Sequence, residues 1–316
     1  MPFGKKNQKN REKLLKKAKK HRLNRYETSK KRLDLVFSPF FEKCYALTMK
    51  LFAFDIDGTL IDDRFENGYF VVYPEIIDAL NTLLDRGDAV LFASGRSLKG
   101  LAQFSRKLLH QDRLFYSASN GTCLYDHEGQ LLYHSYIPYS VFLKMCELYS
   151  GHPDWTYMCY TTNDIVGYRG SPNFAPEEAR FNEMGCEDFT NRVFPEGTML
   201  QKASMTTGSI DAHTLSLFPE LAAYRSYATS SFFFEIMAND VSKAHTVELL
   251  RQQLSIAQDD VYAFGDGDND ISMLEAYHGS APINASEGAK KAARFICPSA
   301  SERGVVFALK EQWKIL

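Results

Sequence analysis

After a basic N-terminal segment, short apolar runs alternate with amphipathic helical stretches, and this alternation limits the possible folds more than any other feature of the chain. The runs at 51–56, 89–93 and 114–118 have the length of buried strands. Helical periodicity fills the stretches at 74–86 and 97–109, the first of which opens on a proline and is followed by a glycine. Strands and helices that alternate in this way form βαβ units with parallel strands. The sequence therefore predicts a doubly wound α/β domain.

This rhythm is interrupted between residues 132 and 236, where the chain is richer in aromatic residues and threonine. The elements expected there are strands at 155–160, 164–168, 199–206 and 232–237 and helices at 139–149 and 211–224. The alternation then resumes with a helix at 242–254 and a strand at 261–264. We therefore expect an α+β domain of residues 132–236, inserted between the two parts of an α/β core, residues 49–131 and 237–316.

Residues 1–48 differ from the rest of the chain in charge. They carry fifteen Lys or Arg residues against four acidic ones, whereas the remaining residues carry 22 basic and 35 acidic ones. Clustered cations bind nucleic acids or anionic membranes by releasing counterions, but aromatic residues for base stacking are nearly absent before Tyr26. Three interpretations stay open: a nucleic-acid or membrane arm, a solvated and partly helical tail, or an extension that is not native, with Met49 as the true start.

Composition excludes several classes of protein. With 45% hydrophobic and 24% charged residues, the chain has a globular composition rather than that of a disordered or coiled-coil protein. No apolar run approaches the roughly 20 residues that span a membrane, and the N-terminus lacks a secretory signal, so we expect a cytoplasmic protein without a membrane partner. The cysteines show no zinc-ligand spacing, and we expect reduced, mostly buried thiols at 44, 123, 146, 159, 186 and 297.

The strongest local signal is the motif Asp-Ile-Asp-Gly-Thr-Leu at 55–60, directly after the first buried run. With a spacing of two, the carboxylates of Asp55 and Asp57 leave the strand on the same side, at the edge where open α/β sheets bind their ligands. Carboxylates this close repel each other unless a divalent cation neutralises them, and an oxygen-preferring ion such as Mg²⁺ fits that need. Alone the pattern is weak, because two solvated turn aspartates before a glycine would look the same.

A second acidic cluster, Gly-Asp-Gly-Asp-Asn-Asp at 265–270, strengthens this interpretation. It also follows an apolar strand and opens a helix, so its carboxylates are expected to reach the same cation from a neighbouring strand. The alternative of an EF-hand calcium loop is disfavoured, because the distal glutamate of such a loop is missing.

Two further features indicate a bound anion. Ser94-Gly95-Arg96 lies at the end of a third strand, where a hydroxyl and free backbone N–H groups at a helix start suit a phosphate oxygen. An ordinary helix cap is the alternative. Lys243 opens the helix after the inserted domain, a position that the helix dipole disfavours for a cation. Contact with an anion and a carboxylate would explain this lysine, and a solvated surface lysine is the alternative.

Together these motifs resemble those of the haloacid dehalogenase-like (HAD) phosphatases, most closely the Cof subgroup. The resemblance covers about residues 49–316 and leaves the basic segment unexplained. It rests on the order and spacing of the motifs 55–60, Ser94-Gly95-Arg96, Ser119-Asn120-Gly121, Lys243 and 265–270. The interval between Asp57 and Ser94 is too short for a cap domain, whereas about 150 residues separate Ser94 from Lys243. The resemblance thus implies a Rossmann-like, doubly wound parallel-sheet HAD core with an inserted α+β cap domain.

The resemblance also implies catalytic and metal-binding roles. Asp55 would be the nucleophile that forms an aspartyl-phosphate, and Asp57 would protonate the leaving oxygen and then activate water. Mg²⁺ would be held by the Asp55 carboxylate, the Asp57 backbone carbonyl and Asp266. Asp270 and Asn269 would support this metal site.

Ser94, Gly95 and Lys243 would hold the phosphoryl group, and Asn120 and Asn269 would add contacts on the substrate side. A lid over such a site excludes water and large substrates, which favours a small phosphorylated metabolite. Sugar phosphates, phosphorylated cofactors and nucleotides are all compatible with such a site. The cap side chains that are candidates for substrate contacts are Trp155, Tyr157, Tyr160, Tyr168, Arg169 and Phe174.

Two alternatives to a Mg²⁺-dependent phosphatase stay open. A phosphosugar mutase would retain a bisphosphate intermediate and form an isomer without free phosphate. A nucleic-acid-associated protein would bind RNA through residues 1–48 with a steep salt dependence. The sequence leaves the substrate open and is compatible with a monomer or a small homo-oligomer.

Overall fold

The computed structural model describes the chain from residue 49 onward, with short gaps. The described residues are 49–62, 65–66, 69–148, 150–152, 154–206, 223–230 and 233–316. The basic segment 1–48 and most of the helix expected at 211–224 lie outside them, so the expectations for those segments stay predictions. Among the described helices, none is both long and apolar enough to span a membrane.

Eight of the described strands form one sheet. Their order across the sheet is β17 (Phe295–Cys297), β16 (His278–Pro282), β15 (Val261–Phe264), β1 (Leu51–Phe54), β4 (Ala89–Ala93), β5 (Leu114–Ala118), β6 (Cys123–Tyr125) and β7 (Leu131–His134). The pairs from β17 to β5 are parallel, and β6 and β7 add antiparallel strands at one edge. The predicted parallel sheet is confirmed, and β4 and β5 have the predicted bounds.

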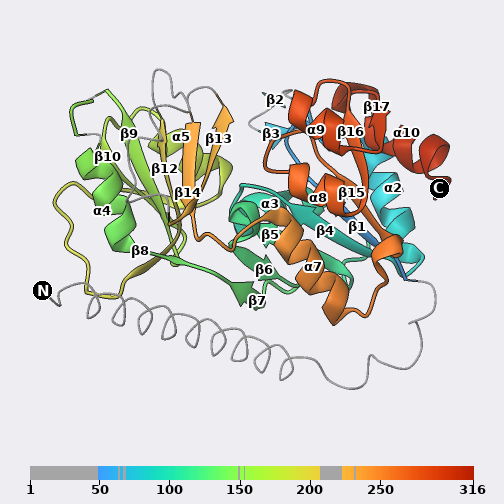
Figure 1. Ribbon diagram of the computed structural model, residues 1–316, viewed down its shortest axis with the longest axis horizontal. Helices are drawn as coiled ribbons and strands as arrows, with labels where there is room; N and C mark the ends of the chain where they lie inside the picture. Colours follow the sequence, from blue (N-terminus) through green and yellow to red (C-terminus); the bar gives the residue numbers. More distant parts are fainter. Residues whose placement is uncertain are drawn as a thin grey trace, which may run out of the picture. The chain divides into compact units, whose positions relative to one another are not determined.

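Helices cover both faces of this sheet, which explains why its central strands β1 and β4 are apolar and buried at every position. In β1, Phe52 and Phe54 belong to the core that also contains residues of α2, α3 and α10, whereas Leu51 and Ala53 belong to the core with α7, α8 and α9. Figure 1 shows α2 beside α10, and the cluster of α7 and α8 on the other side of the strands. The helix bounds are α2 (Pro74–Asp85), α3 (Leu98–Ser105), α7 (Lys243–Gln253), α8 (Ile271–Ala276), α9 (Glu287–Ala292) and α10 (Gly304–Phe307).

Helix α3 is shorter than the helix expected at 97–109. Its N-cap is Ser97, whose side chain accepts the backbone N–H of Gly100. The chain leaves the helix after Ser105 and turns towards α2, where the Leu109 N–H donates to Asn81 Oδ1 at 2.9 Å. This contact between α2 and the following loop takes the place of the last helical turn.

Two hairpins extend the predicted pattern. A turn at Glu128 and Gly129 joins β6 to β7, and Gly129 adopts a φ of +79° in it. Because β7 pairs with β6, the first sheet continues to His134, beyond the core boundary expected at 131. A second hairpin of β2 (Phe65–Glu66) and β3 (Tyr69–Phe70) lies between β1 and α2, and the sequence pattern does not predict it.

Seven described strands of the inserted part form a second sheet. Their order is β11 (Gly185–Asp188), β10 (Ile165–Gly170), β9 (Thr156–Thr161), β12 (Met199–Thr206), β14 (Phe233–Met237) and β13 (Arg225–Ser230), with β8 (Ile137–Pro138) on the start of β12. The helix α4 (Tyr139–Leu148) packs on one face of this sheet, and α5 (Ala175–Phe181) packs on the other. The expected α+β character of the inserted part is confirmed for these residues.

The five cysteines in the described part of the chain are free thiols. Cys123, Cys159 and Cys297 are buried, and Cys186 is exposed. Burial raises the pKa of the Cys123 thiol to about 11, which keeps it protonated and unreactive at neutral pH. The expectation of reduced, mostly buried thiols is therefore confirmed for these residues.

Candidate active site

Four parallel strands of the first sheet end at the same edge and present polar residues there. Asp55 follows β1, Ser94 follows β4, Asn120 lies in the turn after β5, and Asp266 follows β15. Because the strands are parallel, their carboxyl ends meet at one edge. A cavity of about 800 Å³ opens there, and all four residues line it. The topology therefore gathers the predicted motifs into one site.

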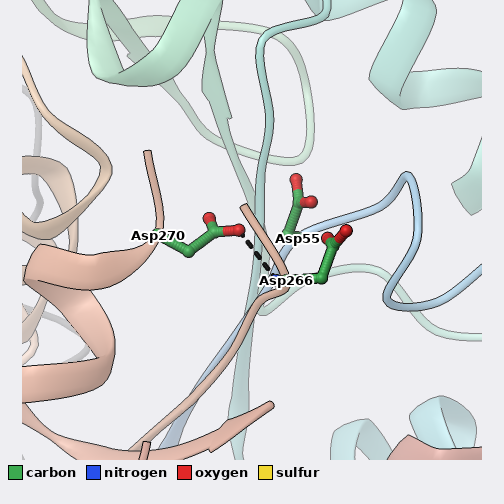
Figure 2. A group of neighbouring side chains, drawn as sticks. All are labelled: Asp55, Asp266 and Asp270. Carbon is green, nitrogen blue, oxygen red and sulfur yellow. Dashed lines mark hydrogen bonds between the residues drawn. The ribbon is translucent and has the colours of Figure 1, made fainter. Parts of the chain in front are cut away.

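Three aspartates form an acidic cluster at this edge. One carboxylate oxygen from each of Asp55, Asp266 and Asp270 lies within 4.8 Å of the other two, and Figure 2 shows the three side chains together. Asp270 precedes α8, and its Oδ2 accepts the backbone N–H groups of Asp266 at 3.0 Å and Gly267 at 2.9 Å. Thr59 Oγ1 donates to Asp266 Oδ1 at 3.0 Å, which ties this loop to the motif after β1.

Two glycines let the loops of the site approach one another. A Cβ atom on Gly58 would lie 2.3 Å from Asp266 Oδ2, and one on Gly121 would lie 2.2 Å from the Ser242 carbonyl oxygen. Both glycines also have a positive φ, +78° and +95°. The glycines that follow Asp57 and Asn120 in the motifs are thus required by close packing as well as by the backbone conformation.

Lys243 lies between two of the clustered aspartates. Its Nζ is 2.7 Å from Asp55 Oδ1 and 2.6 Å from Asp270 Oδ1, and the residue is 1% exposed. Burial alone would lower the pKa of Lys243, but the carboxylates of Asp270 and Asp55 raise it above its ordinary value. The lysine is therefore charged, and the surface-lysine alternative is wrong. The helix that carries it begins after Ser242, whose side chain accepts the His245 N–H at 3.1 Å.

The acidic cluster has the charge and the donor atoms for a divalent cation. Three carboxylates against the one ammonium of Lys243 leave a formal charge of −2 in a mostly buried site. Burial, with a contribution from the charge of Asp270, raises the pKa of Asp55 well above its ordinary value. The same two causes raise the pKa of Asp266 to about 6. A divalent cation would cancel this charge, and carboxylate oxygens are the ligands of hard cations such as Mg²⁺. The residues present therefore fit a bound divalent metal.

Asp57 is oriented differently from the clustered acids. Its two carboxylate oxygens accept hydrogen bonds from Arg96 Nε at 2.8 Å and Arg96 Nη2 at 2.6 Å. The side chain is half exposed, and it lies outside the group formed by Asp55, Asp266 and Asp270. The structure thus does not bring the Asp57 carboxylate to the expected metal site. Asp57 could therefore bind the metal only through its backbone carbonyl oxygen, which is the contact that the resemblance implies.

Four of the core residues expected to contact phosphate or substrate line the cavity, whereas Lys243 is not among the residues of its wall. Ser94, Gly95, Asn120 and Asn269 all belong to its wall. Ser94 is 2% exposed, and its Oγ accepts the Arg96 N–H at 3.3 Å. Asn120 is fully buried, and its Oδ1 accepts a hydrogen bond of 2.9 Å from Asn269 Nδ2. The two asparagines therefore connect the turn after β5 to the loop after β15.

The cavity wall contains charged residues to which the sequence analysis assigns no role. Arg96 belongs to a predicted motif but has no predicted role of its own, and neither Lys202 on β12 nor Glu235 on β14 was predicted. Glu235 is the one polar residue of β14, and a charge inside such an apolar run is the signal that would have revealed it. The strand β12 contains other polar residues, so its sequence does not distinguish Lys202. Asn182 and Asn284 also line the cavity, but no comparable pattern in the sequence distinguishes them.

Most residues in the cavity wall are polar, whereas most of the expected substrate contacts are aromatic. Among the described residues, Phe181 is the one aromatic side chain that lines the cavity. The expected contacts from Trp155, Tyr157, Tyr160, Tyr168, Arg169 and Phe174 are not found in its wall. Tyr160 is instead fully buried beside α5, and its ring packs against the ammonium group of Lys202 at 4.2 Å.

Comparison with known proteins finds one matching family and similar sequences. A model of the family described as haloacid dehalogenase-like hydrolase matches residues 52–309. Among curated proteins, the chain is 25% identical over 268 residues to the Bacillus subtilis (strain 168) protein named "Putative phosphatase YxeH". The match covers 83% of this chain and 97% of that protein.

Solved structures show the same fold. A haloacid dehalogenase-like hydrolase from Bacteroides thetaiotaomicron superimposes with a TM-score of 0.69 at 23% identity, over 84% of this chain and all of that one. A protein described as a HAD subclass IIB sugar phosphatase superimposes with a TM-score of 0.68 at 20% identity, over 85% of this chain and all of that one. At these identities the likeness concerns the fold.

Proposed function

Because the chain belongs to the haloacid dehalogenase-like hydrolases, as its motifs predict, we propose that it is a Mg²⁺-dependent phosphatase acting through an aspartyl-phosphate on Asp55. The observation that carries the proposal is the position of Lys243 Nζ between Asp55 and Asp270, beside Asp266. Lys243 holds the proposed nucleophile, Asp55, at the cavity wall. The negative charge of the surrounding acidic cluster favours the binding of a divalent cation. Asp55, Asp266 and Asp270 would hold that cation, which would supply Lewis-acid stabilisation of the phosphoryl charge.

In the first step, a carboxylate oxygen of Asp55 bonds to the substrate phosphorus, and the bond from phosphorus to the leaving oxygen breaks. Asp57 gives its proton to the leaving oxygen, which departs as an alcohol. Lys243 keeps Asp55 oriented, and the Ser94 hydroxyl donates to a phosphoryl oxygen.

In the second step, Asp57 acts as a base. It takes a proton from a water molecule whose oxygen bonds to the phosphorus while the bond to Asp55 breaks. Inorganic phosphate leaves, and Asp55 returns as a carboxylate while Asp57 again holds a proton. The atoms of one water molecule are thus divided between the phosphate and the alcohol.

For the substrate, we propose a small, hydroxyl-rich phosphomonoester such as a sugar phosphate. Most residues of the described cavity wall carry carboxylates, amides or hydroxyls, which pair with hydroxyl groups, and Phe181 is the one aromatic ring there on which a flat ring would stack. A nucleotide or an aromatic cofactor phosphate fits this wall less well. One structural neighbour is described as a sugar phosphatase, which supports the same choice.

The experiment is phosphate release from a panel of sugar phosphates, nucleotides and pyridoxal phosphate, with and without Mg²⁺, by wild type and Asp55→Asn. Asp268→Asn is the matched control, because Asp268 lies in the same acidic loop but is exposed, and its Oδ1 accepts a hydrogen bond of 2.6 Å from Ser286. We expect Mg²⁺-dependent release that is lost in Asp55→Asn and kept in Asp268→Asn. Turnover by Asp55→Asn, or isomer formation without free phosphate, would contradict the proposal.

A further inference from the structure

Two buried charged residues of the second sheet lie in the cavity wall. Lys202 is 2% exposed and Glu235 is 3% exposed, and they form an ion pair. They stand on neighbouring antiparallel strands, where Lys202 is opposite Tyr160 and Glu235 is opposite Ser204. Their side chains therefore share the face of the second sheet that packs on α5.

Both residues also reach the first sheet. Lys202 Nζ donates to the carbonyl oxygen of Gly95 at 2.9 Å, and Glu235 Oε2 accepts from Asn120 Nδ2 at 2.7 Å. Glu235 Oε1 accepts from Lys202, so each carboxylate oxygen has a protein partner. The Lys202 ammonium has Gly95, Glu235 and the ring of Tyr160 around it. Their polar groups are engaged by the protein rather than directed at a substrate.

These contacts fix Ser94, which is expected to bind the phosphoryl group, and Asn120, which is expected to contact the substrate. The peptide between Gly95 and Arg96 is planar and trans, so the bond from Lys202 to the Gly95 carbonyl also sets the direction of the Arg96 N–H. That N–H donates to Ser94 Oγ at 3.3 Å. On the other side, the bond from Asn120 to Glu235 leaves Asn120 Oδ1 to accept from Asn269, in the acidic loop.

We propose that Lys202 and Glu235 are positioning residues: from the inserted domain, they orient Ser94 and Asn120 for the phosphoryl group. The proposal rests on the proposed function, because it assigns these two residues to the same phosphate site. It predicts that every substrate depends on the pair, whatever its leaving group. A pair that bound substrate hydroxyls would instead matter only for substrates that carry them.

The test compares two substrates, acetyl phosphate and glucose 6-phosphate. Lys202→Met removes the donor to Gly95, and Glu235→Gln keeps the shape but loses the charge. In Lys202→Met we expect kcat to fall about 10- to 100-fold for both substrates, since small misplacements of reacting groups have effects of this size. Lys202→Arg, which keeps a charged donor, recovers part of the loss. Loss confined to glucose 6-phosphate, with a raised KM, would overturn the proposal.

A matched control separates positioning from the mere attachment of the two sheets. Lys99 on α3 forms an exposed ion pair of 2.9 Å with Asp164, in the turn between β9 and β10. Lys99→Met therefore removes a charged contact between the same two parts of the chain, away from the cavity. We expect kcat within twofold of wild type, whereas an equal loss in Lys99→Met and Lys202→Met would contradict a positioning role.

Two further measurements keep the proposal testable if a single variant does not fold or if the proposed activity is absent. The double variant Lys202→Met/Glu235→Leu replaces the buried pair by apolar side chains of similar size, which leaves no unpaired charge. We expect it to fold, as seen by circular dichroism, and to lack the wild-type kcat. Calorimetric titration with inorganic phosphate and Mg²⁺ should show weaker binding in this variant. If wild type binds phosphate but hydrolyses no phosphate ester, the proposed function is wrong. If the double variant binds phosphate with the affinity of wild type, the positioning role is wrong, whether or not the protein is a phosphatase.

Discussion

Arg96 holds the carboxylate of Asp57 through two parallel hydrogen bonds of 2.8 and 2.6 Å, a bidentate pair that fixes the proposed acid and base of the reaction. The guanidinium is itself held in place. It lies 5.2 Å from the ring centre of Phe104, and its Nη1 donates to the Phe181 carbonyl at the end of α5. The orientation of Asp57 in the first sheet is therefore linked to a helix of the inserted part.

Removal of this pair should impair catalysis more than substrate binding. In Arg96→Met, Asp57 loses both hydrogen bonds, and we expect kcat to fall about 10- to 100-fold with KM changed less than threefold. Arg96→Lys restores the charge without the planar pair of donors and should recover only part of the activity. Steady-state kinetics with glucose 6-phosphate measure both. Arg106→Met is the control, because Arg106 forms an exposed ion pair with Glu183 outside the cavity. A wild-type kcat in Arg96→Met would contradict the role of Arg96 in orienting Asp57.

Substitutions of Lys243 and of Asp55 should affect the free energy of unfolding differently, because only the first leaves buried charges without a partner. Lys243→Met leaves the carboxylates of Asp55 and Asp270 buried without their cation, and we expect the free energy of unfolding to fall by about 3–5 kcal/mol. Asp55→Asn removes a charge that burial already disfavours, so the metal-free variant should be at least as stable as wild type while inactive. Urea denaturation without Mg²⁺ measures both, and a large loss of stability in Asp55→Asn would contradict the charge argument.

Mg²⁺ should stabilise the folded protein through the same cluster. At about 100 times its Kd, a ligand specific for the folded state adds about 2.7 kcal/mol, which corresponds to a rise in Tm of about 4 °C for a chain of this size. We expect that rise in wild type and in Asp268→Asn but not in Asp266→Asn. Thermal melts with MgCl₂, compared with NaCl at equal ionic strength, provide the measurement. A rise of equal size in Asp266→Asn would remove Asp266 from the metal site.

His245 gives a pH dependence that is separate from the metal site. Burial lowers the pKa of His245 from the ordinary 6.5, and the positive charge of Arg225 lowers it slightly more. The negative charges of Asp240 and Glu248 raise it, but they do not offset the effect of burial. Below about pH 6.5 the unfolded chain therefore binds a proton more readily than the folded one, and stability falls as the pH falls towards the folded pKa. We expect wild type to lose more stability than His245→Gln between about pH 7.5 and about pH 5.5 in urea titrations. Parallel pH curves for the two proteins would contradict the assignment.

The sequence predicts the fold and much of the site because few physical rules determine them. Apolar runs covered on both faces identify β1, β4, β5 and β15, and their parallel pairing alone brings Asp55, Ser94, Asn120 and Asp266 to one edge. Lys243 was predicted from its unfavourable position at a helix start, and the structure gives it two carboxylates that compensate.

Other features depend on contacts that periodicity does not encode. The hydrogen bonds of Arg96 to Asp57 depend on how the half-exposed side chain of Asp57 is oriented. The spacing of two between Asp55 and Asp57 predicts only the side of the strand from which this side chain leaves. Lys202 reaches Gly95 across more than a hundred residues, and the sequence alone does not show which face of β12 meets the core. For the same reason the aromatic residues of the inserted part were expected near substrate, although the described cavity wall is mostly polar.

The most direct test of the account is chemical identification of the phosphorylated residue. The protein is mixed with acetyl phosphate and Mg²⁺, quenched with acid, reduced with borohydride and digested for peptide mass spectrometry. Asp57→Asn, which lacks the base for the second step, is used beside wild type to accumulate the intermediate. We predict that Asp55 is converted to homoserine, the reduction product of an aspartyl-phosphate, in Asp57→Asn and to a smaller extent in wild type. An unmodified Asp55 in both proteins, while wild type continues to release phosphate, would contradict the account.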